Sequence, residues 1–327
     1  MRLMTRVQLT RVLCLLSVGL WLSASFAPRT FAQDVWQQRD AVNAGTVGIV
    51  SGGVTGTYVR IASDLSNALD SGYELRVLVV LGKGSIRNLE DLLLLKGIDI
   101  AIVQSDVLDF YRTAGIYPNI DNRVRYITKL YNEEVHILAR SDIADVSQLA
   151  GRKVNFGTQG SGTFMTASIV FESLDIDVDA TTFPEPIALE KLRQGEIAAL
   201  VFVGGKPLDL VLQVAKDDGL ALLSVPLDQV EGAYLPGSFS AADYPELVAA
   251  GEEIPTVAVG SVMAVYNWAS DNPRYQKVSR FVTKFFDDFE TFQDAPYHPK
   301  WREVDLRAEV PGWRRFGPAQ EWLSANQ

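Results

Sequence analysis

Short apolar runs alternate with longer segments of helically spaced apolar residues along most of this chain. Residues 46–51, 75–81 and 98–103 are almost continuously apolar, as strands of a parallel sheet are when both faces are covered. Residues 57–69 and 86–95 lie between them and repeat apolar positions at helical spacing. This alternation of strand and helix predicts an α/β fold.

The same alternation begins again after Tyr131. Residues 232–256 are richer in Gly, Pro and Ser and indicate an irregular connection. A strong strand at 257–266 and a helix after Pro273, with phenylalanines at helical spacing, follow that connection. Within this second set we predict strands at 135–139, 153–156, 181–183 and 198–202, and helices at 163–174, 187–194 and 208–215.

Two strand–helix sets and a returning strand predict two α/β lobes, between which the chain crosses more than once. We expect residues 33–132 and 236–327 to form the first lobe and residues 133–235 to form the second. This length is long for one domain and comfortable for two.

The N-terminus has the three parts of a secretory signal peptide. Arg2, Arg6 and Arg11 give a basic start, and an apolar stretch at 12–22 is too short to span a bilayer as a helix. The small residues that follow end in Thr-Phe-Ala, which fits cleavage after residue 32. We therefore expect residues 1–32 to be removed and the mature protein to be periplasmic, with an uncleaved anchor as the alternative.

The charge balance limits the kinds of partner that the chain can bind. After residue 32 the chain carries 26 basic and 40 acidic residues, a net charge of −14. Nucleic-acid binding is therefore not expected, because a basic face carries most of the affinity for phosphates. The one cysteine, Cys14, lies in the predicted signal peptide, so the mature chain has no disulfide and no thiolate ligand.

Three glycine-rich turns stand where a predicted strand passes into a helix, at residues 51–58 (SGGVTGTY), 82–85 (GKGS) and 157–163 (GTQGSGT). Glycine lets the backbone approach a ligand, and a helix N-terminus behind the turn offers free N–H groups to a carboxylate or phosphate. Such turns line the crevice at the carboxyl ends of parallel strands. Two turns from one lobe and one from the other predict a shared ligand cleft, although glycine in a tight turn also has a purely structural role.

Catalytic and cofactor motifs are absent from the sequence. The first turn has Ser51 where a dinucleotide fingerprint needs glycine, and no P-loop, G-x-S-x-G or H-E-x-x-H occurs. His136 lies in an alternating strand and is interpreted as a core histidine. The adjacent acids Glu133 and Glu134 are interpreted as solvent-facing rather than as a catalytic pair. We expect a protein that is not an enzyme and that holds no cofactor or metal.

From these motifs the chain resembles the TAXI family of solute-binding proteins of TRAP transporters, over roughly residues 45–290. The first turn, the G-x-S-x-x-N-L form at 84–89, the A-x-x-Q-S-D form at 101–106 and the second-lobe turn occur in the order of that family, and residues 192–207 resemble its next element. The C-terminus departs, because VPGWRRFGP stands near the place of the family's P-L-H-P-G-A stretch.

The resemblance implies a two-lobed type II periplasmic-binding-protein fold, whose lobes close by a hinge over a ligand and then dock on integral-membrane TRAP subunits. The implied ligand is a small polar solute that bears a carboxylate, either glutamate-like or a dicarboxylate. The ligand-binding residues carried over are Thr55, Thr57, Tyr58, Ser85, Gln104, Ser105, Ser161, Thr163, Gly204 and Pro207.

Arg87 is a further candidate, because a guanidinium in the first turn of a helix could form a two-pronged pair with a carboxylate. The alternative is an exposed arginine paired with Asp91, four residues on. Two other functions stay open: a ligand-binding sensor that docks on a membrane receptor kinase, and a secreted hydrolase.

Overall fold

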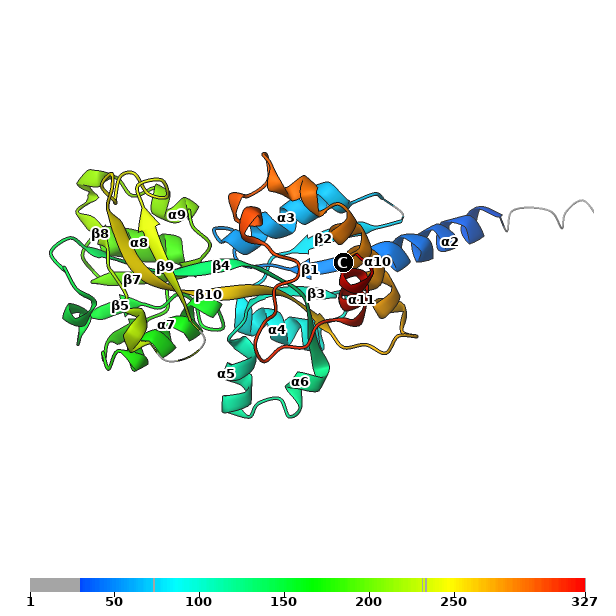
Figure 1. The fold of residues 1–327 in the computed structure, drawn as a ribbon, viewed down its shortest axis with the longest axis horizontal. Helices are drawn as coiled ribbons and strands as arrows, with labels where there is room; N and C mark the ends of the chain where they lie inside the picture. The colour runs from blue at the N-terminus through cyan, green and yellow to red at the C-terminus, as the bar shows by residue number, and fades with distance from the viewer. Residues whose placement is uncertain (1–29, 73, 231, 233, 327) are drawn as a thin grey trace, which may run out of the picture. The chain divides into compact units, whose positions relative to one another are not determined.

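The computed structural model describes residues 30–72, 74–230, 232 and 234–326. The chain divides into two units after Gly45, and the described part of the first unit is helix α2 (Thr30–Gly45) (Figure 1). Nearly all of the predicted signal peptide, residues 1–32, lies outside the described residues, and its cleavage stays a prediction. None of the described helices combines the length and apolar composition that crossing a bilayer requires.

The second unit, from Thr46 onward, is built around one mixed sheet. Its strand order is β2-β1-β3-β10-β4-β7-β5-β6, with β8 beside β4 and β9 beside β10. β1 pairs in parallel with β2 and β3, and β5 pairs in parallel with β6 and β7. The strands are β1 (Thr46–Val50), β2 (Arg76–Val80), β3 (Ile100–Gln104), β4 (Val124–Arg140), β5 (Lys153–Asn155), β6 (Asp179–Thr181), β7 (Ala199–Gly204), β8 (Leu220–Leu222), β9 (Leu235–Ser240) and β10 (Glu253–Tyr266).

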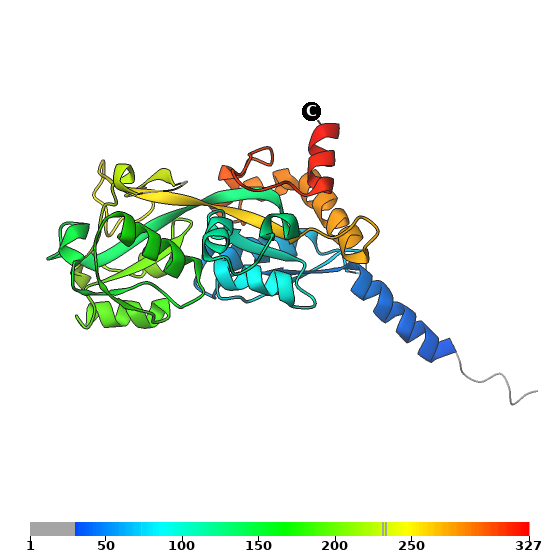
Figure 2. The same cartoon turned by 90° about the horizontal axis from the view of Figure 1, so that it is seen from below.

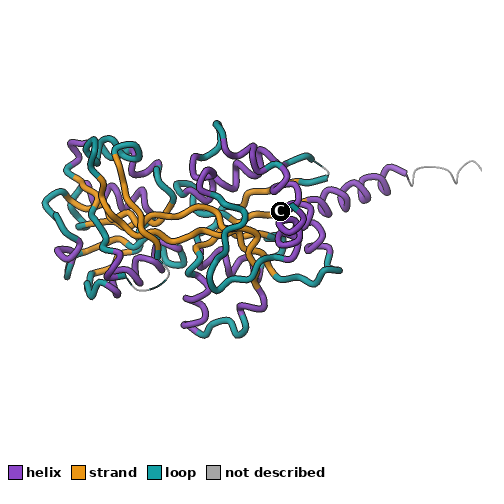
Figure 3. The backbone as a smooth tube through the Cα atoms, in the orientation of Figure 1, coloured by secondary structure: helices purple, strands orange, loops and turns teal. Residues whose placement is uncertain are grey.

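Two long antiparallel strands, β4 and β10, run through both lobes (Figure 3). In the first lobe the C-terminal half of β10 pairs with β3, and in the second lobe the C-terminal part of β4 pairs with β7. The pairing of β4 with β10 shifts register on either side of Val262, between Gly260 and Ala264. This irregularity lies where the two lobes meet. A bulge of this kind bends a strand locally.

Helices cover both faces of the sheet in each lobe (Figures 1 and 2). In α3 the apolar residues Ile61, Leu65 and Leu69 share one stripe, and they pack with α10 on one face of the first lobe, while α4 and α5 cover the other. The helices are α3 (Thr57–Leu69), α4 (Ser85–Leu94), α5 (Val107–Ala114), α6 (Ile120–Arg123), α7 (Gly162–Ser173), α8 (Glu185–Arg193), α9 (Asp209–Leu212), α10 (Pro273–Asp287) and α11 (Gly317–Ala325), with 3₁₀ turns η1 (Val146–Leu149), η2 (Lys216–Asp218), η3 (Leu227–Gln229), η4 (Phe289–Gln293) and η5 (Pro299–Glu303).

The segment 232–256 was predicted to be irregular, and that prediction is wrong for much of it. It contains β9 and the start of β10. Pro236 is tolerated in β9 because this strand pairs only with β10 and leaves its other edge free. Phe239 and Tyr244 pack in the same core cluster as Leu200 of the second lobe, so the chain returns to the first lobe within β10 and not at residue 236.

A buried ion pair ties the crossing strand β4 to the C-terminal part of the chain. Lys300 is 2% exposed, and its Nζ lies 2.7 Å from Oε1 of Glu134 and 2.7 Å from Oε1 of Glu303. Oε2 of Glu134 accepts a hydrogen bond from the backbone N–H of Lys206, at 3.0 Å. Burial raises the pKa of Glu134, and the Lys300 ammonium opposes that rise. Glu134 is therefore a paired interior charge, and its interpretation as solvent-facing is wrong.

Replacing Lys300 by methionine should destabilise the fold. The change leaves the Glu134 carboxylate buried without its cation, which typically costs about 3–5 kcal/mol. Lys284→Met is a matched control, because Lys284 pairs with Asp288 on the exposed surface of α10, where loss of a pair costs about 0.2–1 kcal/mol. Urea unfolding at neutral pH measures both, and equal losses of unfolding free energy would contradict the buried pair.

Candidate functional site

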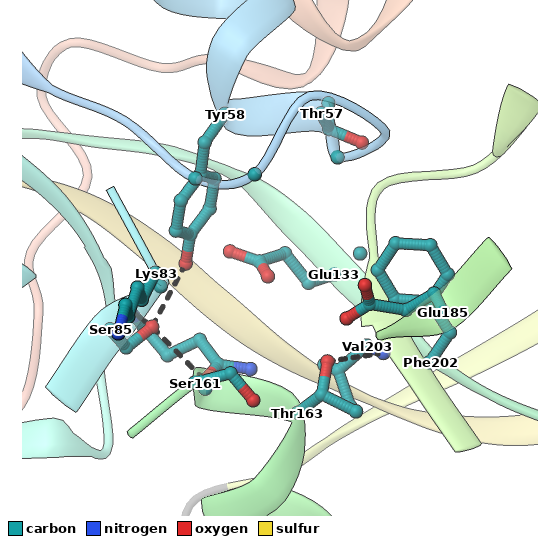
Figure 4. A pocket seen from close by; sticks show the side chains of 17 residues that line it. Thr57, Tyr58, Lys83, Ser85, Glu133, Ser161, Thr163, Glu185, Phe202 and Val203 are labelled. Atoms are coloured by element: carbon teal, nitrogen blue, oxygen red, sulfur yellow. Dashed lines mark hydrogen bonds between the residues drawn. The ribbon is translucent and has the colours of Figure 1, made fainter. Parts of the chain in front are cut away.

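The three glycine-rich turns meet around one cavity between the lobes (Figure 4). The turns after β1 and β2 lead into α3 and α4, and the turn after β5 leads into α7, so all three lie at carboxyl ends of parallel strands. The cavity measures about 60 Å³, whereas about 10–15 Å³ holds one water, so it suits a small solute. It is lined by Gly52, Gly53, Gly56, Thr57, Tyr58, Lys83, Gly84, Ser85, Gln104, Glu133, Ser161, Gly162, Thr163, Glu185, Phe202, Val203 and Gly204.

The lobes touch one another across this cavity, so the structure shows a closed state. The backbone N–H of Arg87 donates to the carbonyl of Gly160 at 3.0 Å, and the Thr57 hydroxyl donates to the carbonyl of Gly205 at 3.0 Å. Gly162 makes the tightest approach: a Cβ there would lie 1.8 Å from Oε1 of Gln104. Only glycine fits at this point of the closed interface.

The wall from the first lobe is a small hydrogen-bond network at the start of α4. The Ser85 hydroxyl accepts from the backbone N–H of Gln104 at 2.9 Å and donates to its Oε1 at 3.1 Å. It also lies 3.2 Å from the Tyr58 hydroxyl, whose pKa is raised well above its usual value by burial and by the charge of Glu133. These bonds hold Oε1 of Gln104, while its buried Nε2 has no hydrogen-bond partner in the residues that the structure describes.

The wall from the second lobe comes from α7, α8 and β7. The Ser161 hydroxyl caps α7 by accepting from the N–H of Phe164 at 3.0 Å. The Thr163 hydroxyl accepts from the N–H of Val203 at 3.2 Å and so fixes α7 against β7. The carboxyl of Glu185, the first residue of α8, also lines the cavity (Figure 4), and burial raises its pKa.

The structure brings most of the sequence-predicted residues together. Seven of the eleven line the cavity, and Thr55 and Pro207 line a smaller neighbouring pocket that also includes His298. Ser105 lies outside both pockets, where its backbone bonds the carbonyl of Gly260 and the indole of Trp313. The seven are Thr57, Tyr58, Ser85, Gln104, Ser161, Thr163 and Gly204.

Arg87 is not among the residues that line the cavity, and its role as a ligand-binding side chain stays a prediction. Its side chain is 54% exposed and pairs with Glu90 at 2.9 Å and with Asp91 at 3.4 Å. The guanidinium pairs with carboxylates of its own helix, and the pair with Asp91 is the alternative that the sequence allowed.

Sequence reasoning missed the charged residues of the cavity. Glu133 is 2% exposed, and its side chain lies between Tyr58 and Glu185 (Figure 4). Burial raises the pKa of Glu133 well above its usual value, against the opposing effect of the Tyr58 hydroxyl. Lys83 lies on the opposite wall and is exposed. The signal in the sequence was two adjacent acids directly before the apolar run that continues the strand.

The interpretation of His136 as a core histidine is confirmed. It is fully buried, its Nε2 lies 2.7 Å from the Tyr244 hydroxyl, and its ring packs on Phe239 with centroids 4.4 Å apart. Burial lowers its pKa to about 3, so it is neutral at physiological pH.

A second contact across the lobes involves Asp106, which follows β3. Its Oδ2 accepts from the Tyr234 hydroxyl at 3.2 Å and from the Thr166 hydroxyl at 3.4 Å, both in the second lobe. Burial raises its pKa from 3.8 to about 6, and its Oδ1 has no hydrogen-bond partner among the described residues.

Comparison with known proteins agrees with this architecture. The chain matches the NMT1-like family over residues 49–300. The periplasmic binding protein BugD superposes with a TM-score of 0.52 at 13% identity, over 86% of this chain and 93% of BugD. The alkanesulfonate-binding protein SsuA from Xanthomonas axonopodis pv. citri, bound to MOPS, gives 0.46 at 14% identity, over 76% of this chain and 75% of SsuA. The likeness to BugD confirms the predicted α/β fold of the two-lobed type II periplasmic-binding class.

Replacing Gly162 by alanine should prevent closure. The new Cβ would lie 1.8 Å from Gln104 and 2.5 Å from the Ser85 hydroxyl, both in the opposite lobe, so the clash exists only when the lobes meet. Alanine favours helix, so α7 itself should fold normally. Small-angle scattering should show a larger radius of gyration than for the wild type.

Gly53→Ala is the matched control for this variant. Gly53 lines the same cavity, but a Cβ there would meet nothing within 4 Å. Its scattering should equal that of the wild type. If Gly162→Ala also scatters like the wild type, the closed interface is not as tight as the structure shows.

Closure should depend on pH through Asp106. Its pKa is raised to about 6 in the closed state, whereas an aspartate exposed in an open state keeps an ordinary value near 3.8. Closing therefore binds a proton, and the closed state gains from Asp106 as pH falls from about 6 toward 4 and loses that gain above 6. Fluorescence transfer between dyes on the two lobes measures the closed fraction. Asp106→Asn should flatten the curve over this window, and an unchanged curve would count against the assignment.

Proposed function

The chain belongs to the NMT1-like family, and we propose that it is an extracytoplasmic solute-binding protein that captures a small polar solute between its lobes for a membrane transporter. The observation that carries the proposal is the cavity between the lobes, which they build from the carboxyl ends of their parallel strands. Its buried walls hold two polar atoms that have no hydrogen-bond partner among the described residues, Gln104 Nε2 and Glu133 Oε1, as a site does when a ligand completes its hydrogen bonds.

Several features support binding rather than catalysis. The Ser85 hydroxyl is held by Tyr58 and Gln104, and none of its hydrogen-bond partners is a general base. His136 lies outside the cavity lining and is neutral, with a pKa lowered to about 3. A solute held by these walls would meet hydrogen-bonding groups but no activated nucleophile, which disfavours the secreted-hydrolase alternative.

The finer proposal is that the membrane partner is a TRAP transporter. It is supported by the resemblance of the glycine-rich turns and the A-x-x-Q-S-D form to the TAXI family. The N-termini of α3, α4 and α7 all open at the cavity, and their N–H groups suit a carboxylate on the solute. A sensor that docks on a receptor kinase would use the same closed lobes, and neighbouring genes distinguish the two: TRAP membrane subunits favour uptake, and a kinase favours sensing.

Ligand binding without turnover is the central prediction. Mass spectrometry of small molecules released from the natively purified protein should identify the solute. Adding that solute back should raise the melting temperature, because a ligand at about 100 times its dissociation constant stabilises the native state by about 2.7 kcal/mol. The Gly162→Ala variant, which should not close, should show a much smaller rise. Chemical conversion of the solute during incubation would refute a purely binding role.

A further inference from the structure

Glu133 and Glu134 are adjacent on β4 and both are buried, but their carboxyl groups lie in different surroundings. Successive residues of a strand point to opposite faces. Glu134 meets the Lys300 ammonium at 2.7 Å, whereas Glu133 lines the cavity and its Oε1 has no hydrogen-bond partner within the described part of the chain. The fold supplies a buried cation to one carboxyl group and leaves the other facing the ligand space.

The remaining charges of the cavity are mainly acidic. Glu185, at the start of α8, brings a second carboxyl group, and Lys83 is exposed. No arginine or histidine is among the residues that line the cavity in the described part of the chain. Ionising a buried carboxyl group that has no cation beside it is costly, so a positive group brought by the solute would be favoured beside Glu133 because it offsets that cost.

The same cavity also offers hydrogen-bond donors. Nε2 of Gln104 is buried without a partner, and α4 and α7 begin beside it, at Ser85 and Gly162. Free N–H groups at helix N-termini and a side-chain amide donor suit an oxygen acceptor such as a carboxylate. The cavity therefore presents these donors as well as the two carboxyl groups of Glu133 and Glu185, which form its acidic end.

We infer that the solute carries a protonated nitrogen, which pairs with the carboxylate of Glu133, and an oxygen acceptor, which faces Gln104 and the starts of α4 and α7. This inference rests on the proposed solute-binding function and narrows the ligand class. It selects amine-bearing acids over dicarboxylates, because a second carboxylate would face Glu133. Glu133 is thus the residue that determines specificity at the acidic end.

The test compares matched pairs of small acids with and without an amino group. The panel pairs L-glutamate with glutarate, L-aspartate with succinate, and β-alanine with propionate, each titrated into the full mature protein by calorimetry. The inference expects binding among the amino acids and at least tenfold weaker binding of each nitrogen-free partner, since a hydrogen bond between charged groups contributes about that factor. Equal or tighter binding of the nitrogen-free acids overturns it, because a protonated Glu133 would then donate to an oxyanion.

The Glu133→Gln variant tests whether Glu133 acts on the solute, because a purely structural role would not change the relative affinities for the two acids of a pair. The amide keeps the shape of the side chain and removes its charge, so affinity for the amino acid should fall tenfold or more while the nitrogen-free partner gains relative to it. The melting temperature of the ligand-free variant should stay the same or rise, because burial raises the pKa of Glu133 and so favours its neutral form, which the amide resembles in shape and charge. Glu190→Gln, on the exposed surface of α8, is the control and should leave affinities unchanged.

Failure of this inference is distinguishable from failure of the proposed function. If mass spectrometry finds a released solute that raises the melting temperature but contains no basic nitrogen, the inference is overturned and the binding function stands. A third outcome is that no member of the panel binds and the released solute proves to be an amine of another kind. The affinity of that amine for Glu133→Gln then tests the pairing, and the inference expects it to fall. Unchanged affinity in that variant overturns the pairing.

Discussion

The antiparallel pairing of β4 with β10 is the constraint on which the rest of this structure depends. Both strands pass through both lobes, so the two parallel sheets become parts of one continuous sheet. The carboxyl ends of β1, β2 and β3 are thereby turned toward those of β5 and β7, and the glycine-rich turns of the two lobes meet. The register shift around Val262 falls at the crossing, where a local irregularity permits bending without breaking the ladder.

This arrangement also explains why the interior charges lie where they do. The crossing strand carries Glu133 and Glu134 at the level of the cavity, and the pleat turns them to opposite sides. The C-terminal segment covers one side and brings Lys300 to Glu134. The opposite side faces the cavity, so one carboxyl group is paired within the fold and the other lines the cavity.

Closure depends on backbone proximity as much as on side-chain chemistry. Gly84 adopts a positive φ of 106° at the start of α4, and a Cβ there would lie 3.1 Å from the backbone of Gly162. Two helix N-termini can approach a shared ligand only if neither presents a side chain at that point. The glycines of these turns therefore set how far the lobes close, and the polar residues beside them, Ser85 and Ser161, order the helix starts.

The order of strands and helices could be read from the sequence because it depends on local patterns. Apolar runs and helical spacing located α3 to its ends. The glycine-rich turns contain five of the seven predicted residues that line the cavity, since a turn between a parallel strand and a helix has only one edge of the sheet to occupy. The edge strand β9 was missed because its Pro and Gly imitate a loop and only its pairing with β10 makes it a strand. The acidic end of the cavity could be located only from the tertiary structure. Whether Glu133 faces solvent, a lysine or a ligand depends on which segments cover each side of β4, and those segments are distant in sequence.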